Sequence, residues 1–404
     1  MDSVWERRSV GARSVWLADT VTPSLAKWSP APGSRANLVL SYLGSGARAR
    51  KTIAGVAAVV ACAMCTPASA RSPAPRTIAT FPGVVRAFDY EAARIAWIDS
   101  AWVLRGRSVR SGAESATFYT NPYEEIPAPG SVGRLVLGES RLLWVSTRGT
   151  GMFEEADHVY TAEIGAAKGQ RLTTEEHGDG SDGAYVTGLA GDRGGFSFGS
   201  VVVEAVGADK QSYQVTGGGV WSVVKGVPHR LSGAPPAYVA ARSSGRVALR
   251  PVSRDVRPAG TPIPAGPVEV RNATTGASIS RFDPGAVRSL AMNAAYVAVL
   301  TGRRIVLYDV HEGRLAGSTR VPADTAADIV VAGQFVVFHT QSGVHILDPT
   351  SGWLYTLATT KAPWKITNIA ADLSTIAWVE SRRVAAGEPA RRTFVSRVRT
   401  VPAP

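Results

Sequence analysis

The sequence contains internal repeats, and these restrict the possible folds more than any other feature. Residues 82–97 resemble residues 284–299 without gaps, at an offset of 202. A second repeat has an offset of 39 and relates residues 305–315 to residues 344–354, and residues 268–276 are a weaker copy. Self-similarity at a period of roughly 20 to 50 residues is typical of solenoids, propellers and related arrays.

Each repeat unit reads as four strands. A strand with alternating apolar residues leads through a short turn to a strongly apolar inner strand. Such inner strands are residues 95–98, 142–145, 297–300, 335–338 and 376–379. A third strand reaches the pattern Asp-x-x-x-Gly, in which Gly313 and Gly352 supply a positive φ and Asp309 and Asp348 hydrogen-bond the turn. A fourth strand follows, and four antiparallel strands per unit are typical of a propeller blade.

We therefore predict an all-β fold, a β-propeller of seven four-stranded blades. The units start near Val85, Val132, Ala184, Ala237, Ala286, Ala327 and Ile366. Glycine-rich and proline-rich insertions interrupt residues 184–266, so six or eight blades stay open from the sequence. A pair of β-sandwiches also contains many short strands, but the regular period disfavours that fold.

The two ends of the repeat region predict how the ring closes. Residues 77–81 precede Pro82 as residues 278–282 precede Pro284, so they resemble a fourth strand without a blade of its own. The last unit ends in residues 392–398, its expected third strand. We expect the N-terminal strand of the mature chain to complete the last blade, because this leaves no unpaired inner edge.

An export signal precedes this strand. A basic stub at residues 48–51 is followed by an apolar stretch at residues 52–65 and by an A-x-A site at Ala68 and Ala70. This order is that of a secretory signal peptide, with cleavage after Ala70. The apolar stretch is too short for a membrane span, which needs about 20 residues. An alternative is that Val-Val-Ala-Cys62 resembles a degenerate bacterial lipobox, with Cys62 lipidated.

The chain accordingly divides into three parts. Residues 1–45 lack the hydrophobic periodicity of a helix or strand. They are interpreted as an unstructured extension, or as the result of a start codon assigned too far upstream. Residues 46–70 form the signal peptide, and residues 71–404 form a single propeller domain. Both cysteines, Cys62 and Cys65, precede the cleavage site, so the mature chain would have no disulfide. The expected location is secreted or at the cell envelope, with a lipid-anchored form as the alternative.

The charge of the chain does not indicate nucleic-acid binding. The net charge is +12, from 44 basic and 32 acidic residues. The basic residues after the signal are single arginines along the strands, not a basic stripe interleaved with aromatic residues. The preference for Arg over Lys, with abundant Ala, Gly and Val, instead reflects GC-rich coding, as in many bacteria.

Several motifs resemble functional sites but lack their context. Residues 195–199 fit the Gly-x-Ser-x-Gly nucleophile elbow, but a strand follows where the elbow needs a helix. Residues 178–183 fit Gly-x-Gly-x-x-Gly without the flanking strand and helix, and are interpreted as an inter-blade loop. His339 and His345 flank one turn without a third metal ligand. We therefore expect no catalytic, cofactor or metal site at these positions.

Five tryptophans divide into two groups. Trp97, Trp144 and Trp378 recur in the apolar inner strands, where they are expected to pack between blades. Trp353 and Trp364 lie nearer loops, where they are candidate surfaces on which a ligand stacks.

The Asp-x-x-x-Gly hairpin and the four-strand period, over about residues 76–400, resemble the WD40-like, quinoprotein-like and TolB-like propellers of exported bacterial proteins. The resemblance implies the fold and no activity. The Trp-Asp ending and Gly-His opening of true WD40 repeats are absent, as is the repeated tryptophan-docking pattern of quinone-dependent dehydrogenases.

These observations predict an exported, monomeric propeller that binds a protein, small molecule or glycan at a mouth of its central channel, with membrane attachment only if it is lipidated. The alternative is a propeller lyase or hydrolase with its site at the channel mouth. Such an enzyme would gather at least two candidate residues at one mouth, whereas a binding scaffold would scatter them. The candidates are His158, His229, His311, Asp328 and Glu380.

Overall fold

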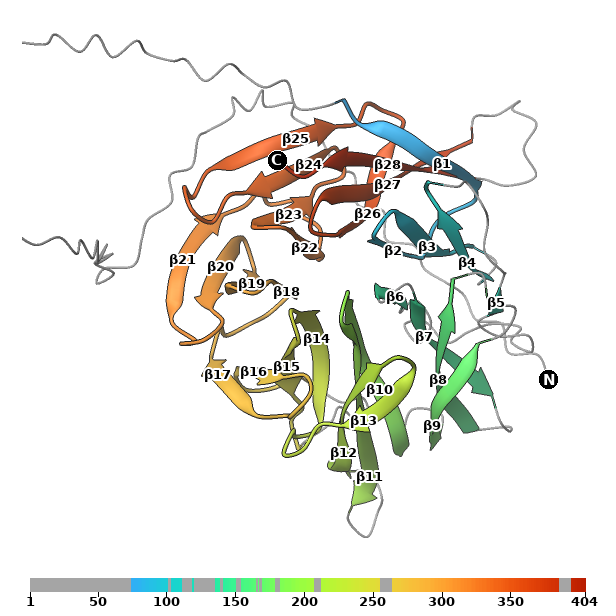
Figure 1. The fold of residues 1–404 in the computed structure, drawn as a ribbon, viewed down its shortest axis with the longest axis vertical. Helices are drawn as coiled ribbons and strands as arrows, with labels where there is room; N and C mark the ends of the chain where they lie inside the picture. The colour runs from blue at the N-terminus through green and yellow to red at the C-terminus, as the bar shows by residue number, and fades with distance from the viewer. Residues whose placement is uncertain are drawn as a thin grey trace, which may run out of the picture.

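The protein is a closed ring of seven blades (Figure 1). The computed structural model describes residues 74–100, 103–110, 118–119, 135–138, 141–149, 154–164, 166, 169–178, 182–206, 212–254, 264–384 and 394–404. These residues form 28 strands and no helix, with four antiparallel strands in each blade. The predicted all-β, seven-bladed propeller is therefore confirmed.

The strands follow one another outward from the ring axis. Blade 1 consists of β2 (Ala87–Glu91), β3 (Arg94–Ile98), β4 (Val103–Ser108) and β5 (Phe118–Tyr119), blade 2 of β6 (Leu135–Gly138), β7 (Arg141–Gly149), β8 (Glu154–Glu163) and β9 (Gln170–Gly178), and blade 3 of β10 (Gly183–Asp192), β11 (Gly195–Val206), β12 (Ser212–Val224) and β13 (Val227–Arg230). Blade 4 consists of β14 (Ala237–Ser243), β15 (Arg246–Pro251), β16 (Val268–Asn272) and β17 (Ser278–Phe282), and blade 5 of β18 (Ser289–Met292), β19 (Tyr296–Thr301), β20 (Arg304–Asp309) and β21 (Leu315–Arg320). Blade 6 consists of β22 (Ile329–Ala332), β23 (Phe335–His339), β24 (Gly343–Leu347) and β25 (Leu354–Thr359), and blade 7 of β26 (Lys365–Ala371), β27 (Thr375–Arg383), β28 (Phe394–Pro402) and β1 (Arg76–Pro82). Each first strand begins within three residues of its predicted unit start.

Blades 2 and 3 form one continuous eight-stranded sheet. A single residue pair, His177 with Gly183, joins the outer strand of blade 2 to the inner strand of blade 3. The glycine-rich segment that made the blade count uncertain lies inside the long strand β12. The insertion therefore lengthens a blade and does not add one.

The N-terminal strand closes the ring as predicted. Strand β1 pairs antiparallel with β28, the third strand of blade 7, from Arg76 opposite Thr400 to Pro82 opposite Val395. Beyond the strand, the N–H of Gly83 donates to the carbonyl of Phe394 at 2.8 Å. The first described strand and the last thus belong to the same blade, and the blade has no missing strand.

The hydrophobic core lies between the blades. The described residues contain seven clusters of buried apolar side chains, one at each junction of neighbouring blades. On β3, Ile95 and Trp97 pack towards blade 7, whereas Ala96 and Ile98 pack towards blade 2. A strand whose alternating side chains are both buried must be apolar throughout, which explains the strongly apolar second strands. The predicted packing role of Trp97, Trp144 and Trp378 is confirmed, because all three are at most 3% exposed.

The Asp-x-x-x-Gly hairpins also form as predicted. Gly313 and Gly352 have φ of 65° and 70°. In the hairpin of blade 5, Oδ1 of Asp309 accepts the N–H groups of His311 at 2.7 Å and Glu312 at 2.8 Å. These hairpins are local structures, since every contact that forms them is made within a few residues.

Candidate binding site at one end of the ring

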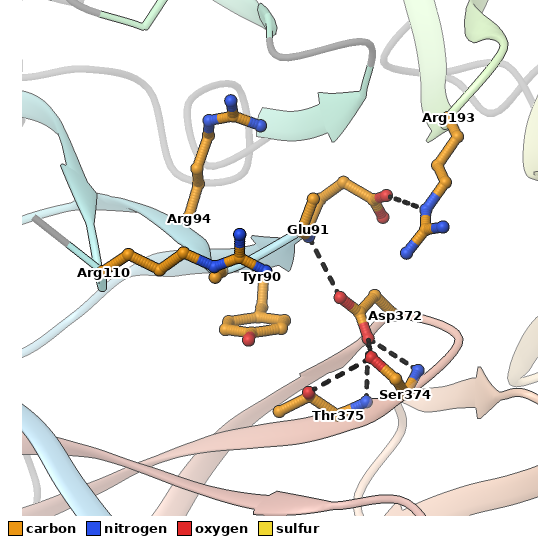
Figure 2. Close-up of a pocket in the computed structure, with 10 residues that line it drawn as sticks. Tyr90, Glu91, Arg94, Arg110, Arg193, Asp372, Ser374 and Thr375 are labelled. Atoms are coloured by element: carbon orange, nitrogen blue, oxygen red, sulfur yellow. Dashed lines mark hydrogen bonds and ion pairs between the residues drawn. The ribbon is translucent and has the colours of Figure 1, made fainter.

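Two hollows open at one end of the ring, where the turns between the first and second strands of the blades meet. We call these turns the AB turns. The lateral hollow, of about 420 Å³, lies between the AB turns of blades 1 and 7 (Figure 2). The axial hollow, of about 230 Å³, is lined by AB turns of blades 1, 3, 4, 5, 6 and 7. Glu91, Arg193 and Asp372 line both hollows, so the two adjoin.

The AB turn of blade 1 is strained. It is a two-residue hairpin loop in which Glu91 pairs with Arg94, and Ala92 and Ala93 have φ of 50° and 62°. Two positive φ values in such a loop define a type I′ turn, which favours Asn and Gly. A side chain in this region costs on the order of 1 kcal/mol or more. Asp372 of blade 7 stabilises the turn, because its Oδ2 accepts the N–H of Ala92 at 3.0 Å.

The equivalent turn of blade 5 has the same two alanines and a different conformation. Residues 294–295 align with residues 92–93 in the repeat, yet neither residue 294 nor residue 295 has a positive φ. Oδ1 of Asn293 accepts the N–H of Tyr296 at 2.9 Å, so a side chain caps this longer turn. Glu91 stands one position before the alanines in blade 1, and its longer carboxylate instead reaches an arginine of blade 3. The residue before the turn therefore decides its shape.

Both carboxylates of the lateral hollow are engaged by donors of the protein. Oε1 of Glu91 lies 3.1 Å from Nε of Arg193, and the Glu91 side chain is only 14% exposed. Burial raises the pKa of Glu91, and its hydrogen bond with Arg193 opposes this shift. Oδ1 of Asp372 accepts the N–H groups of Ser374 and Thr375, each at 2.8 Å, and the Ser374 hydroxyl at 3.1 Å.

Two arginines of the lateral hollow, in contrast, are not paired with other groups of the described chain. Arg94 begins β3, and Arg110 follows β4, the neighbouring strand of the same blade. The N–H of Val109 donates to the carbonyl of Ala93 at 2.8 Å, which places the backbones of the two arginines beside one another at the end of the sheet. Within the described ranges, neither guanidinium forms a hydrogen bond or ion pair. The nearby phenol of Tyr90 is neutral, since burial raises its pKa.

A buried arginine, Arg242, lines the axial hollow and supports its wall. The Arg242 side chain, at the end of β14 in blade 4, is 3% exposed, and its Nε donates to Oδ1 of Asp192 at 3.0 Å. Its Nη1 donates to the Phe196 carbonyl at 3.0 Å and to the hydroxyls of Ser197 and Ser222 at 2.8 and 3.1 Å. The guanidinium therefore ties blade 4 to blade 3.

The candidate catalytic residues from the sequence are not brought together. They lie in five different blades: His158 on β8, His229 on β13, His311 between β20 and β21, Asp328 before β22, and Glu380 on β27. None of them lines either hollow. Glu380 is fully buried, where it accepts the indole N–H of Trp378 at 2.9 Å and pairs with Arg397 at 2.6 Å.

The Gly-x-Ser-x-Gly motif has a structural role in the described chain. Ser197 lies within β11, is fully buried and accepts the Arg242 hydrogen bond described above. At Gly199 a Cβ would lie 2.2 Å from the Ala237 carbonyl oxygen, so only glycine fits. In the Gly-x-Gly-x-x-Gly motif, Gly178 ends β9 and Gly183 begins β10, and the residues numbered 179–181 lie outside the described part.

The histidine pair is held by ordinary contacts. His345 stacks on Phe338 with ring centroids 5.2 Å apart, and burial lowers its pKa. His339 is buried, and its Nε2 lies 3.6 Å from Oδ2 of Asp328. In the part of the chain that the structure describes, no group of three or more His, Cys, Asp or Glu side chains is arranged to hold a metal ion.

The two candidate stacking tryptophans differ in accessibility. Trp353 is 50% exposed, and its ring stacks beside Tyr355 with centroids 6.5 Å apart. The ring of Trp364 is already covered, because the guanidinium carbons of Arg397 and Arg382 lie 4.0 and 5.4 Å from its centroid. Trp364 therefore stacks on arginines of its own blade, contrary to the prediction that a ligand would stack there.

The predicted signal peptide, with Ala68 and Ala70, and the alternative lipidation site Cys62 lie outside the described residues. Among the residues that are described, none belongs to a helix with the length and apolar character that crossing a membrane requires.

Comparison with known proteins finds distant structural similarity and no relative in sequence. No protein-family model matches the chain, and no curated protein matches it in sequence. The chain has the fold of a seven-bladed β-propeller. The crystal structure of BamB from Moraxella catarrhalis is similar to it with a TM-score of 0.41 and 13% identity, over 78% of this chain and 85% of BamB. The structure of U3-55K is similar with a TM-score of 0.48 and 15% identity, over 81% of this chain and 98% of U3-55K. At these identities the likeness concerns the fold alone.

Sequence reasoning missed the residues that line the lateral hollow. A usable signal was present, because a carboxylate or amide side chain ends or follows the first strand in blades 1, 3, 5 and 7: Glu91, Asp192, Asn293 and Asp372. A polar residue at the same place in several repeats indicates one end of the ring, where the AB turns meet.

Proposed function

We propose that this protein is an exported binding propeller that holds its ligand or protein partner at the AB-turn end of the ring. One observation carries the proposal. In the lateral hollow the carboxylates of Glu91 and Asp372 are engaged by protein donors, whereas the guanidinium groups of Arg94 and Arg110 have no partner among the described residues. The charged groups left free to meet a ligand are therefore cations.

The same observation favours binding over catalysis by a lyase or hydrolase. General acid–base catalysis needs a side chain that gains and loses a proton near neutral pH. Arginine stays protonated throughout that range, so it binds anions but does not transfer protons. None of the five acid–base candidates of the sequence lines either hollow.

Export is supported by the position of the closing strand. Strand β1 begins at Arg76, six residues after Ala70. Cleavage after Ala70 would leave β1 in the mature chain, and lipidation at Cys62 would do the same. Intact mass and N-terminal sequencing of the protein from culture medium and from host membranes distinguish the two forms. An uncleaved chain in the cytosol would contradict export.

Site-specific photo-cross-linking in the native host tests the binding role. Leu373, in the AB turn of blade 7, is 60% exposed and lines the axial hollow, so a photoreactive amino acid there faces any partner at this end. Gln341, exposed in the turn between β23 and β24, is the matched control at the opposite end. We expect a discrete cross-linked product from position 373 and none from position 341. Cross-linking only from position 341 would contradict the proposal, and so would the absence of a product from both positions together with no binding of a small ligand at this end.

A further inference from the structure

The lateral hollow has two chemically different walls. One wall carries the guanidinium groups of Arg94 and Arg110, and the other carries the hydroxyl side chains of Ser374 and Thr375 on the AB turn of blade 7 (Figure 2). Its volume of about 420 Å³ falls within the range of roughly 300–1,000 Å³ that small-molecule sites occupy. A ligand that fills it would meet cations on one side and neutral hydroxyls on the other.

The cationic wall suits a single oxyanion. Arg94 and Arg110 extend from adjacent strands of blade 1 and both line the hollow, so both cations attract an anion that enters it. Guanidinium groups bind carboxylate and phosphate in a bidentate manner, which makes arginine better suited than lysine to such groups. The charge of Arg193 is compensated within the protein, because its Nε is paired with Glu91.

The opposite wall limits the ligand to one anionic group. The carboxylate of Asp372 lies beneath Ser374 and Thr375, and a second anion near it would be repelled. The Ser374 hydroxyl donates to Asp372 and the Thr375 hydroxyl is hydrogen-bonded to the Tyr90 phenol, and each oxygen keeps a lone pair that can accept a hydrogen bond from a hydroxyl group of a sugar. The phenol of Tyr90 provides an aromatic surface between the two walls (Figure 2).

The backbone that carries Arg94 is fixed before a ligand arrives. Arg94 directly follows the strained Ala92–Ala93 turn, and Asp372 of blade 7 holds that turn through the N–H of Ala92. Backbone in sparsely populated conformations persists where the surrounding structure enforces it, and such positions concentrate at ligand sites. The strained turn and the two arginines thus line the same hollow between blades 1 and 7.

We propose that the lateral hollow binds a small sugar acid, meaning a hydroxylated ligand with one carboxylate or one phosphate group. Arg94 and Arg110 hold the anionic group, and Ser374 and Thr375 hydrogen-bond the hydroxyl groups. This inference rests on the proposed binding function and specifies the ligand class of the same end of the ring.

Isothermal titration calorimetry of the purified protein tests the inference with four probes: glucuronate, glucose 6-phosphate, glucose and inorganic phosphate. We expect one of the two charged sugars to bind at least about tenfold more tightly than glucose and than inorganic phosphate, since a hydrogen bond to a charged group contributes about 1.5–3 kcal/mol. The preferred charged sugar identifies the anionic group. Equal binding of glucose and both charged sugars, or no binding of either charged sugar, would overturn the proposal.

Variants locate the site. The double substitution Arg94→Ala with Arg110→Ala is expected to abolish the preference for the charged sugar over glucose. Arg94→Lys with Arg110→Lys retains the charge and loses the bidentate geometry, so it should retain part of the preference even if the alanine variant fails to fold. Arg303→Ala, at an exposed arginine in the turn between β19 and β20, is the matched control and should leave affinity unchanged. An unchanged preference in the folded lysine and alanine variants would refute the site.

Failure of this inference is distinguishable from failure of the binding function. Cross-linking from position 373 depends on a partner near the axial hollow and does not require Arg94 or Arg110. A cross-linked product together with no sugar-acid binding would refute only the ligand class. No product and no binding would refute both.

Discussion

Substitution of Arg242 by leucine should destabilise the junction between blades 3 and 4. The guanidinium donates hydrogen bonds to Asp192, to the Phe196 carbonyl and to the hydroxyls of Ser197 and Ser222, over distances of 2.8–3.1 Å. Leucine has a similar apolar stem and no donor. The variant would therefore leave a carboxylate and several acceptors without a partner in a nearly buried position.

The expected cost follows from the burial of the ion pair. The side chains of Arg242 and Asp192 are 3% and 14% exposed, so solvent cannot replace the lost donor fully. Removal of one member of a buried ion pair costs about 3–5 kcal/mol, largely because the other charge stays buried. Neutralising that charge should recover part of the loss, so the double variant Arg242→Leu with Asp192→Asn should be more stable than the single variant by about 1–2 kcal/mol.

Equilibrium unfolding in guanidinium chloride, followed by tryptophan fluorescence, measures the effect as a change in the free energy of unfolding. Arg281→Leu is the matched control, because Arg281 is exposed on β17 of the same blade and should change stability by no more than about 0.5 kcal/mol. A loss below about 1 kcal/mol in Arg242→Leu would refute the reasoning. So would a double variant that is no more stable than the single one.

Three further predictions concern other junctions. Burial raises the pKa of Asp89, whose carboxylate bonds the N–H of Leu137 across blades 1 and 2, to about 7. The folded protein thus binds this proton more tightly than the unfolded chain, so the contribution of Asp89 to stability should be complete below about pH 4 and lost as the pH rises through about 7. The substitution Asp89→Asn should therefore reduce the dependence of the melting temperature on pH over this range. An unchanged pH dependence in the variant would contradict the assignment. Gly199→Ala should lower the free energy of unfolding by at least about 1–3 kcal/mol in the same denaturation assay, because its Cβ would lie 2.2 Å from a carbonyl oxygen. Gly217→Ala is the control and should have little effect, since its Cβ would have its nearest neighbour at 3.4 Å. A chain that lacks β1 should melt at a lower temperature in calorimetry, and a synthetic peptide of the residues numbered 74–84 should restore part of the loss; no recovery would count against closure by strand pairing.

The repeated units allowed the fold to be predicted because their signals are local. The Asp-x-x-x-Gly hairpins of blades 5 and 6 form through contacts within a few residues, and the apolar second strands reflect burial on both faces. Closure of the ring was predictable for the same reason. Residues 77–81 carry the pattern of a fourth strand, and their partner β28 carries that of a third.

Predictions about individual side chains were less reliable where contacts between distant segments decide the outcome. Trp364 was expected to offer a free ring, but Arg397, which is distant in sequence, covers it at 4.0 Å. The Gly-x-Ser-x-Gly pattern was predicted to belong to a strand or turn, but its sequence did not reveal that the last glycine is required by the approach of a neighbouring blade. Neither contact leaves a trace in the local pattern of hydrophobicity.

The sequence by itself determined the all-β class, the four-strand unit and the joint that closes the ring, and it favoured seven blades, because periodicity and turn chemistry act over short stretches of chain. Tertiary structure alone decided the candidate site. Ala92 and Asp372 are 280 residues apart in sequence and become hydrogen-bonded only because the ring brings blade 7 against blade 1. An alanine pair stands at the equivalent turn of blades 1 and 5, but the two turns differ in conformation, since the side chain before each turn meets a different partner. Which charges stay free for a ligand depends on these long-range pairings, and no local pattern encodes them.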